Sequence, residues 1–214
     1  MHPMTRLAAV ATVATTAVGL STANADLVNL VSNNAASTEN LGSYTGTLDY
    51  TSGGANSATI VLTLTNTTAV ATGGFITAVA LMHGDNYAGA TITLTGSTDA
   101  DFGNLTPPVS GSPFGDFRGG ASTSSSWLGG GAPSAGIGVG QSITLTFSLT
   151  GTGMGLLSAA DLVGLHSGHY DMAVRFRGMT NGGSDKVPGQ LIPTPAAASL
   201  LGMGGLMAAR RRRR

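Results

Sequence analysis

The chain has 214 residues, no cysteine and a charged fraction of only 9%. This length is typical of one domain with short extensions. The lack of cysteine excludes disulfides, Cys-ligated metals and thiol nucleophiles. The formal net charge is zero, but five of the nine arginines end the chain, and residues 26–192 contain all ten acids and four bases. This acidic middle argues against nucleic-acid or phosphate binding, which needs clustered Lys and Arg.

The first 25 residues have the three-part pattern of a secretory signal peptide. Arg6 supplies positive charge, residues 7–20 form an uncharged apolar stretch, and Ala23 and Ala25 fit the small-x-small rule for cleavage. The apolar stretch is shorter than the roughly 20 residues of a membrane-spanning helix. The pattern predicts export, with a mature protein that begins at Asp26. A short buried helix is the alternative.

Residues 26–187 form the predicted domain, and their apolar residues alternate with polar ones in the period-two pattern of β-strands. The segments that show it are residues 43–51, 59–66, 91–95, 142–150 and 170–177. The clearest is 142–150, where Ile, Leu and Phe alternate with Ser and Thr, which predicts an antiparallel strand with one solvent face. By contrast, residues 75–82 are apolar on both faces, as in a central strand that is covered on each side.

The remaining segments complete an all-β prediction. Ser158 and Asp161 form a capping box, which predicts one short helix. Residues 96–140 make a long Gly-, Ser- and Pro-rich connection with aromatic residues, in which we expect one or two irregular strands between Phe114 and Trp127. Short strands separated by such turns favour an antiparallel β-sandwich, immunoglobulin-like or jelly-roll-like, with at most one short helix.

Residues 188–214 combine a proline motif, an apolar run and an arginine cluster. The run, residues 196–209, would be about 21 Å long as a helix, so it spans a bilayer only with flanking residues or local thinning. The positive charges would stay cytoplasmic, and the preceding apolar run argues against a nucleic-acid-binding tail. The motif and cluster residues are Pro193, Thr194, Pro195, Arg210, Arg211, Arg212, Arg213 and Arg214.

This order of features resembles the PEP-CTERM sorting signal, a tail recognised by exosortase-type membrane enzymes. Thr194 stands where the family's motif has glutamate, so the processing enzyme and the cut position stay open. The resemblance implies a transient membrane helix, removal of the tail, and release or attachment of the protein at the cell surface. A permanent tail anchor is the alternative.

The middle of the chain is similar to uncharacterised secreted, β-rich proteins that carry PEP-CTERM tails. The stretches that carry this resemblance are residues 120–126, 133–137, 174–178 and 181–188. The resemblance implies a β-rich exported protein and brings no enzymatic activity with it.

Three histidines follow the signal peptide: His83, His166 and His169. Although His166 and His169 are three residues apart, a zinc site needs three or four ligands, and the sequence shows no third partner. We therefore interpret the histidines as loop residues and predict no cofactor. No Ser forms a G-x-S-x-G elbow, and no pair of acids indicates a glycosidase, so we predict no catalytic residues.

Three further patterns have a functional and a structural interpretation. Asp99, Asp101 and Asn104 are weak calcium candidates, but the full calcium loop is missing and Asp and Asn are ordinary turn formers. Threonine alternates at residues 91–95 and 144–146 as in an ice- or sugar-facing array, but no internal repeat supports one. Trp127 is a possible glycan-stacking residue, although a chain with 5% aromatic residues needs most of them in its core.

Together these patterns predict a non-enzymatic protein of the cell surface or extracellular matrix. Its partners would be the export machinery, an exosortase-type enzyme and the membrane before processing. One alternative is a module that binds carbohydrate, such as exopolysaccharide, through Trp127. The other is an adhesion domain stabilised by calcium at the candidates named above.

Overall fold

The computed structural model describes residues 25–192. Of the predicted processing sites, Ala23, the Pro193-Thr194-Pro195 motif and the arginine cluster lie outside this range. Ala25 is the first residue of the first strand. Within residues 25–192 no helix is both long and apolar enough to cross a membrane.

The described chain is built almost entirely of antiparallel strands. In chain order they are β1 (Ala25–Ser32), β2 (Tyr44–Gly54), β3 (Ser57–Asn66), β4 (Gly73–His83), β5 (Thr91–Ser97), β6 (Gly103–Leu105), β7 (Val109–Ser110), β8 (Asp116–Ser122), β9 (Ser142–Thr150), β10 (Leu165–His166), β11 (His169–Tyr170), β12 (Met172–Met179) and β13 (Ser184–Leu191). The short 3-10 helices are η1 (Asn34–Ala36), η2 (Pro133–Ala135), η3 (Met154–Leu156) and η4 (Ala159–Leu162).

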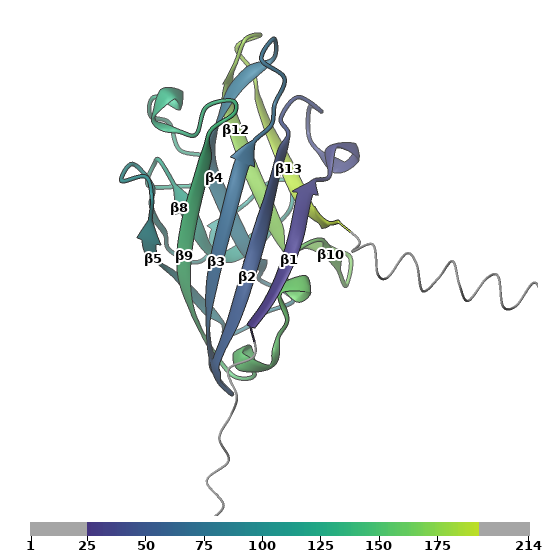
Figure 1. Ribbon diagram of the computed structural model, residues 1–214, viewed down its shortest axis with the longest axis vertical. Coiled ribbons are helices and arrows are strands. Elements are labelled where there is room, and N and C mark those ends of the chain that lie inside the picture. Colours follow the sequence, from purple (N-terminus) through teal and green to yellow (C-terminus); the bar gives the residue numbers. More distant parts are fainter. Residues whose placement is uncertain (1–24, 193–214) are drawn as a thin grey trace, which may run out of the picture.

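One 11-stranded sheet contains every strand except the β10–β11 hairpin. Its order is β5-β9-β3-β2-β1-β13-β12-β4-β8-β6, with β7 also paired to β8. The sheet is nearly closed, because β5 at one edge contacts β8 near the other. Figure 1 shows β9, β3, β2 and β1 side by side in front, with β12, β4 and β8 behind them.

The period-two pattern located the main strands well. β9 has the predicted bounds, and its Ile143, Leu145, Phe147 and Leu149 are all buried in the main core. Burial of each such side chain contributes about 1.5–3 kcal/mol relative to exposure. The prediction of an antiparallel all-β fold is therefore confirmed. The predicted helix is the single 3-10 turn η4, where the Asp161 carboxylate accepts hydrogen bonds from both the amide and the hydroxyl of Ser158.

The expectation that residues 75–82 form a strand covered on both faces is also confirmed. One face of β4 contributes to the main core, and the other is covered by the long connection that follows β5. This connection contains three strands, of which only β8 lies in the predicted window. A second core cluster forms beneath it and consists of Ala78, Ala80, Leu105, Val109, Phe117, Trp127 and Ala173.

Trp127 belongs to this second core and is only 2% exposed. Its carbonyl oxygen accepts a hydrogen bond of 2.6 Å from Nη1 of Arg175 on β12. The ring therefore has no free face on which a sugar stacks in this structure. The structural interpretation of Trp127 explains its position better than the glycan-stacking hypothesis does.

We expect Trp127→Ala to lower the free energy of unfolding by about 3–5 kcal/mol, because it empties the centre of the second core. Urea denaturation followed by circular dichroism measures this change. The adjacent Leu128 is 49% exposed, so Leu128→Ala is the matched control and should cost less than about 1 kcal/mol. Equal losses in the two variants would contradict the assignment of Trp127 to the core.

A buried carboxylate fastens the loop between η1 and β2 to the last strand. Asp185 on β13 is fully buried and accepts five hydrogen bonds. The donors are the Thr38 hydroxyl and the backbone amides of Glu39, Leu41, Gly42 and Lys186. These five hydrogen bonds compensate for the cost of burying the Asp185 carboxylate away from water.

Candidate metal centre

Two segments far apart in the sequence bring two histidines together. His83 is the last residue of β4, and Asp85 follows in the next turn. His169 begins β11 after a two-residue turn in which Ser167 and Gly168 both have positive φ, 50° and 86°. Such a turn closes a tight β-hairpin. Because β12 directly follows β11 and pairs with β4, the hairpin lies against the end of β4.

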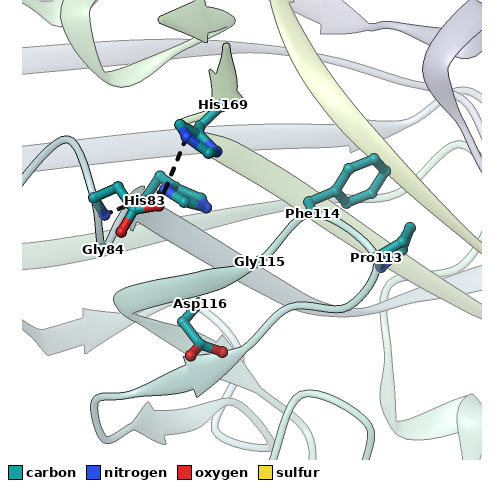
Figure 2. Close-up of a pocket in the computed structure, with 8 residues that line it drawn as sticks. His83, Gly84, Pro113, Phe114, Gly115, Asp116 and His169 are labelled. Carbon is teal, nitrogen blue, oxygen red and sulfur yellow. Dashed lines mark hydrogen bonds and ion pairs between the residues drawn. The ribbon is translucent and has the colours of Figure 1, made fainter. Parts of the chain in front are cut away.

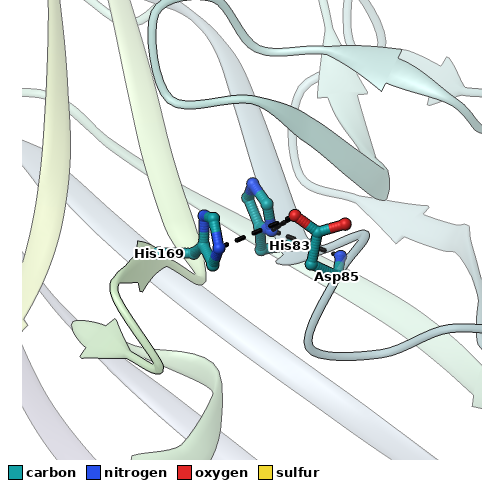
Figure 3. Close-up of side chains that lie close together, drawn as sticks. All are labelled: His83, Asp85 and His169. Carbon is teal, nitrogen blue, oxygen red and sulfur yellow. Dashed lines mark hydrogen bonds and ion pairs between the residues drawn. The ribbon is translucent and has the colours of Figure 1, made fainter.

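The three side chains lie close together, with Asp85 beside the two imidazole rings (Figure 3). Oδ2 of Asp85 is 3.8 Å from Nδ1 of His83 and 3.6 Å from Nε2 of His169. The two imidazole rings are stacked with centroids 4.2 Å apart and an interplanar angle of 14°. The three candidate ligand atoms all lie within 4.8 Å of one another.

Nδ1 of His83 accepts a hydrogen bond of 3.3 Å from the amide of Asp85. An imidazole nitrogen has one lone pair, so a metal ion bound at Nδ1 would take the place of this hydrogen bond. On the other side of the ring Gly115 comes very close, with φ of +96°, and a Cβ at this position would overlap Nε2 of His83. Burial lowers the pKa of His83, and the nearby His169 lowers it further against the opposing effect of Asp85. A lowered pKa favours the neutral ring, the form that binds metals.

A cavity of about 350 Å³ opens beside the cluster (Figure 2). His83 is buried at its base, whereas the side chains of His169 and Asp85 are 41% and 74% exposed. The rest of the wall consists of Gly84 and residues 113–116. The cluster is therefore accessible from solvent, with its nitrogen and oxygen donors at the cavity edge.

Two imidazole nitrogens and one carboxylate oxygen form a donor set that suits zinc and similar divalent transition metals. Zinc bonds of about 2.0 Å at tetrahedral angles place ligand atoms about 3.3 Å apart. The two distances to Oδ2 of Asp85, 3.6 and 3.8 Å, exceed this by a few tenths of an ångström, and all three ligand atoms lie within 4.8 Å of one another. The two stacked rings would have to tilt so that both lone pairs point at a shared ion. Calcium and magnesium prefer ligands that are all oxygen. Three protein ligands would leave one coordination position open toward the cavity.

The histidine pair suggested by sequence spacing is not the pair that the structure forms. His166 and His169 are cross-strand partners in the hairpin, but Nδ1 of His166 lies 3.6 Å from Oδ2 of the buried Asp171. Asn86 donates to the other carboxylate oxygen of Asp171 at 2.7 Å, and burial raises the pKa of Asp171 to about 6. His83 is the missing partner of His169, and sequence analysis did not single out Asp85. The only local signal is a His-x-Asp at the end of an apolar strand.

The calcium candidates take part in hydrogen bonds with the backbone. Oδ1 of Asp99 accepts the amide of Asp101 at 3.0 Å, in a turn that follows β5. This bond is the ordinary turn chemistry of Asp. The side-chain oxygen of Asn104 on β6 instead accepts the amide of Leu94 at 2.7 Å and so connects β6 to β5.

None of the known protein families, curated proteins or solved structures compared with this chain matches it. The functional argument therefore depends on the geometry of the described residues.

Proposed function

We propose that the chain is an exported, non-enzymatic protein of the cell envelope or extracellular matrix, and that its β domain binds a divalent transition-metal ion. His83, Asp85 and His169 would hold the ion, with zinc as the expected metal. The observation that carries the proposal is that three donors of the right type lie within 4.8 Å of one another beside an open cavity. They come from the end of β4, the turn after it and the β10–β11 hairpin.

The destination of the protein is proposed from its two ends. The signal peptide would direct export, and a cut after Ala25 would leave β1 whole except for its first residue. The PEP-CTERM-like tail would place the protein in the membrane until an exosortase-type enzyme removes it. Intact-mass analysis of protein recovered from its native cells tests both cuts. A mass that includes Met1 and the arginine cluster would contradict this part of the proposal.

We also propose that the nearly closed sheet is a β-sandwich. Strands β5, β9, β3, β2 and β1 would form one layer, and β13, β12, β4, β8 and β6 the other, with the main core between them. The layers seen in Figure 1 support this division. Solution of an experimental structure would decide between an immunoglobulin-like and a jelly-roll-like topology.

The metal proposal predicts selective stabilisation by zinc. Zinc at about 100 times its Kd adds about 2.7 kcal/mol to the free energy of unfolding if it binds only the folded state. For a domain of this size, the melting temperature rises by about 5 °C or more. Differential scanning calorimetry of the full chain, with zinc chloride, calcium chloride or EDTA, measures this effect. Stabilisation by calcium alone would instead favour the turn with Asp99 and Asp101, and no stabilisation by zinc would remove the metal proposal.

A further inference from the structure

In the layer made of β5, β9, β3, β2 and β1, one face points to solvent. The register of the strands aligns Thr and Ser hydroxyls on this face, which we call the hydroxyl face. Thr47 on β2 pairs with Thr63 on β3, which pairs with Thr144 on β9, so the three side chains form one row. The row on one side is Thr45, Thr65 and Ser142. On the other side come first Asp49, Val61 and Thr146, and then Thr51, Thr59, Ser148 and Thr93. Rows lie about 7 Å apart along a strand, and neighbours within a row about 5 Å apart.

These hydroxyls keep hydrogen-bonding capacity for a ligand. Thr63 and Thr144 share a hydrogen bond of 3.0 Å, and Thr65 and Ser142 share one of 2.8 Å. Each hydroxyl has one donor hydrogen and two acceptor lone pairs, so every such pair still has one hydrogen and several lone pairs to offer. The face therefore presents donors and acceptors together.

The face is also almost free of charge. Strands β1, β2, β3, β5 and β9 contain no Lys, Arg or His. Their two acids are Asp26, which accepts the amide of Ala159, and Asp49, which alternates with the buried Leu48 and Tyr50 and so faces the array. Oδ1 of Asp49 is enclosed and has no hydrogen-bond partner within residues 25–192. Because this oxygen has almost no exposed surface, it is not available to a ligand on the face.

A shallow groove of about 470 Å³ crosses the array. Its walls come from β1, β2 and β3, with Ile192 at one edge. The polar residues that line it are Asn29, Thr45, Thr47, Thr63 and Thr65. The groove therefore exposes an amide and four hydroxyls and no ionic group.

We propose that this hydroxyl face binds a neutral polysaccharide. A sugar hydroxyl is both donor and acceptor, so it matches the threonine hydroxyls. The absence of basic residues from the five strands argues against phosphate, sulfate and acidic glycans. The sheet is twisted, as all such sheets are, so its face suits a flexible polymer chain better than the flat lattice of ice. This site is independent of the metal centre.

Affinity electrophoresis of the full chain in a sugar-free nonionic detergent tests this proposal. The gels contain dextran, hydroxyethyl cellulose or the acidic polygalacturonate. We expect at least one neutral polymer to retard the chain and polygalacturonate to leave it unaffected. Replacing Thr47, Thr63 and Thr144 together with Val removes one row of hydroxyls but keeps the shape and the strand preference. This row variant should bind the neutral polymer at least tenfold more weakly.

A single substitution, Thr63→Lys, places a bulky charge on the same row and should have a similar effect if the row variant does not fold. Its matched control is Thr106→Lys, because Thr106 is an exposed threonine outside this face, between β6 and β7. Binding by Thr106→Lys should equal that of the unmodified chain. The proposal is overturned if no neutral polymer retards the chain, if polygalacturonate does, or if Thr63→Lys binds normally. It is also overturned if sedimentation shows a dimer that Thr63→Lys dissociates, because the face would then hold a second copy.

Discussion

Replacing Asp185 with Ala is expected to lower the free energy of unfolding by about 4 kcal/mol. The substitution leaves five donors without their acceptor, four of them backbone amides, in a part of the fold where Asp185 itself is fully buried. Each unpaired buried donor costs about 1–3 kcal/mol, although water that enters the loop recovers part of this cost. Urea denaturation of the two proteins measures the difference.

Glu39 provides the matched control because it is an exposed acid on the same loop. Glu39→Ala keeps the backbone amide that Asp185 accepts and removes only a solvated carboxylate, so the change should stay within about 0.5 kcal/mol. Asp185→Asn keeps one acceptor oxygen and should fall between the two. If Asp185→Ala unfolds at the same urea concentration as Glu39→Ala, the carboxylate does not fasten the loop.

Replacing His169 with Ala is expected to weaken zinc binding by roughly 100-fold or more. The change removes one of three protein ligands, and loss of even an outer-shell partner costs about 10–100-fold in affinity. His169 is partly exposed and lies on a hairpin with a two-residue turn, so the fold should tolerate the substitution. Competition with a chromophoric chelator at pH 7.5 measures the affinity.

His166→Ala is the matched control on the same hairpin. His166 pairs directly with His169 across the strands but contacts Asp171, outside the metal cluster. Its replacement should change the zinc affinity by less than about threefold. Equal effects of the two substitutions would show that the hairpin, and not the His169 nitrogen, determines the affinity.

The fold could be predicted where information is local. In residues 142–150 the alternation of apolar and polar side chains sets both the strand and its buried face, and β9 has those bounds. Residues 75–82 are apolar on both faces except for Thr77, which indicates a strand covered on both sides, and both sides are covered in the structure. The strands in the connection after β5 are harder to predict from sequence, because β6 and β7 are very short and form by pairing with β8.

The candidate sites depend on contacts between distant residues. His83 and His169 meet because β12 pairs with β4, and nothing in the spacing of the histidines encodes that pairing. Long-range strand pairing also explains why the sequence alone does not predict the threonine array. Its regularity comes from the register between β2, β3 and β9, whereas a sequence repeat would show it only along one strand. The hydrogen bonds of Asp185 to the loop before β2 likewise join residues that are more than 140 positions apart.

Imidazole nitrogen resonances give the most direct test of the metal centre. A two-dimensional proton–nitrogen spectrum of the full chain reports each ring nitrogen of His83, His166 and His169 separately. One equivalent of zinc should shift Nδ1 of His83 and Nε2 of His169, the two atoms that lie nearest Asp85. The His166 resonances should stay in place. A zinc-dependent shift at His166 alone, or no shift at any of the three residues, would contradict the metal centre.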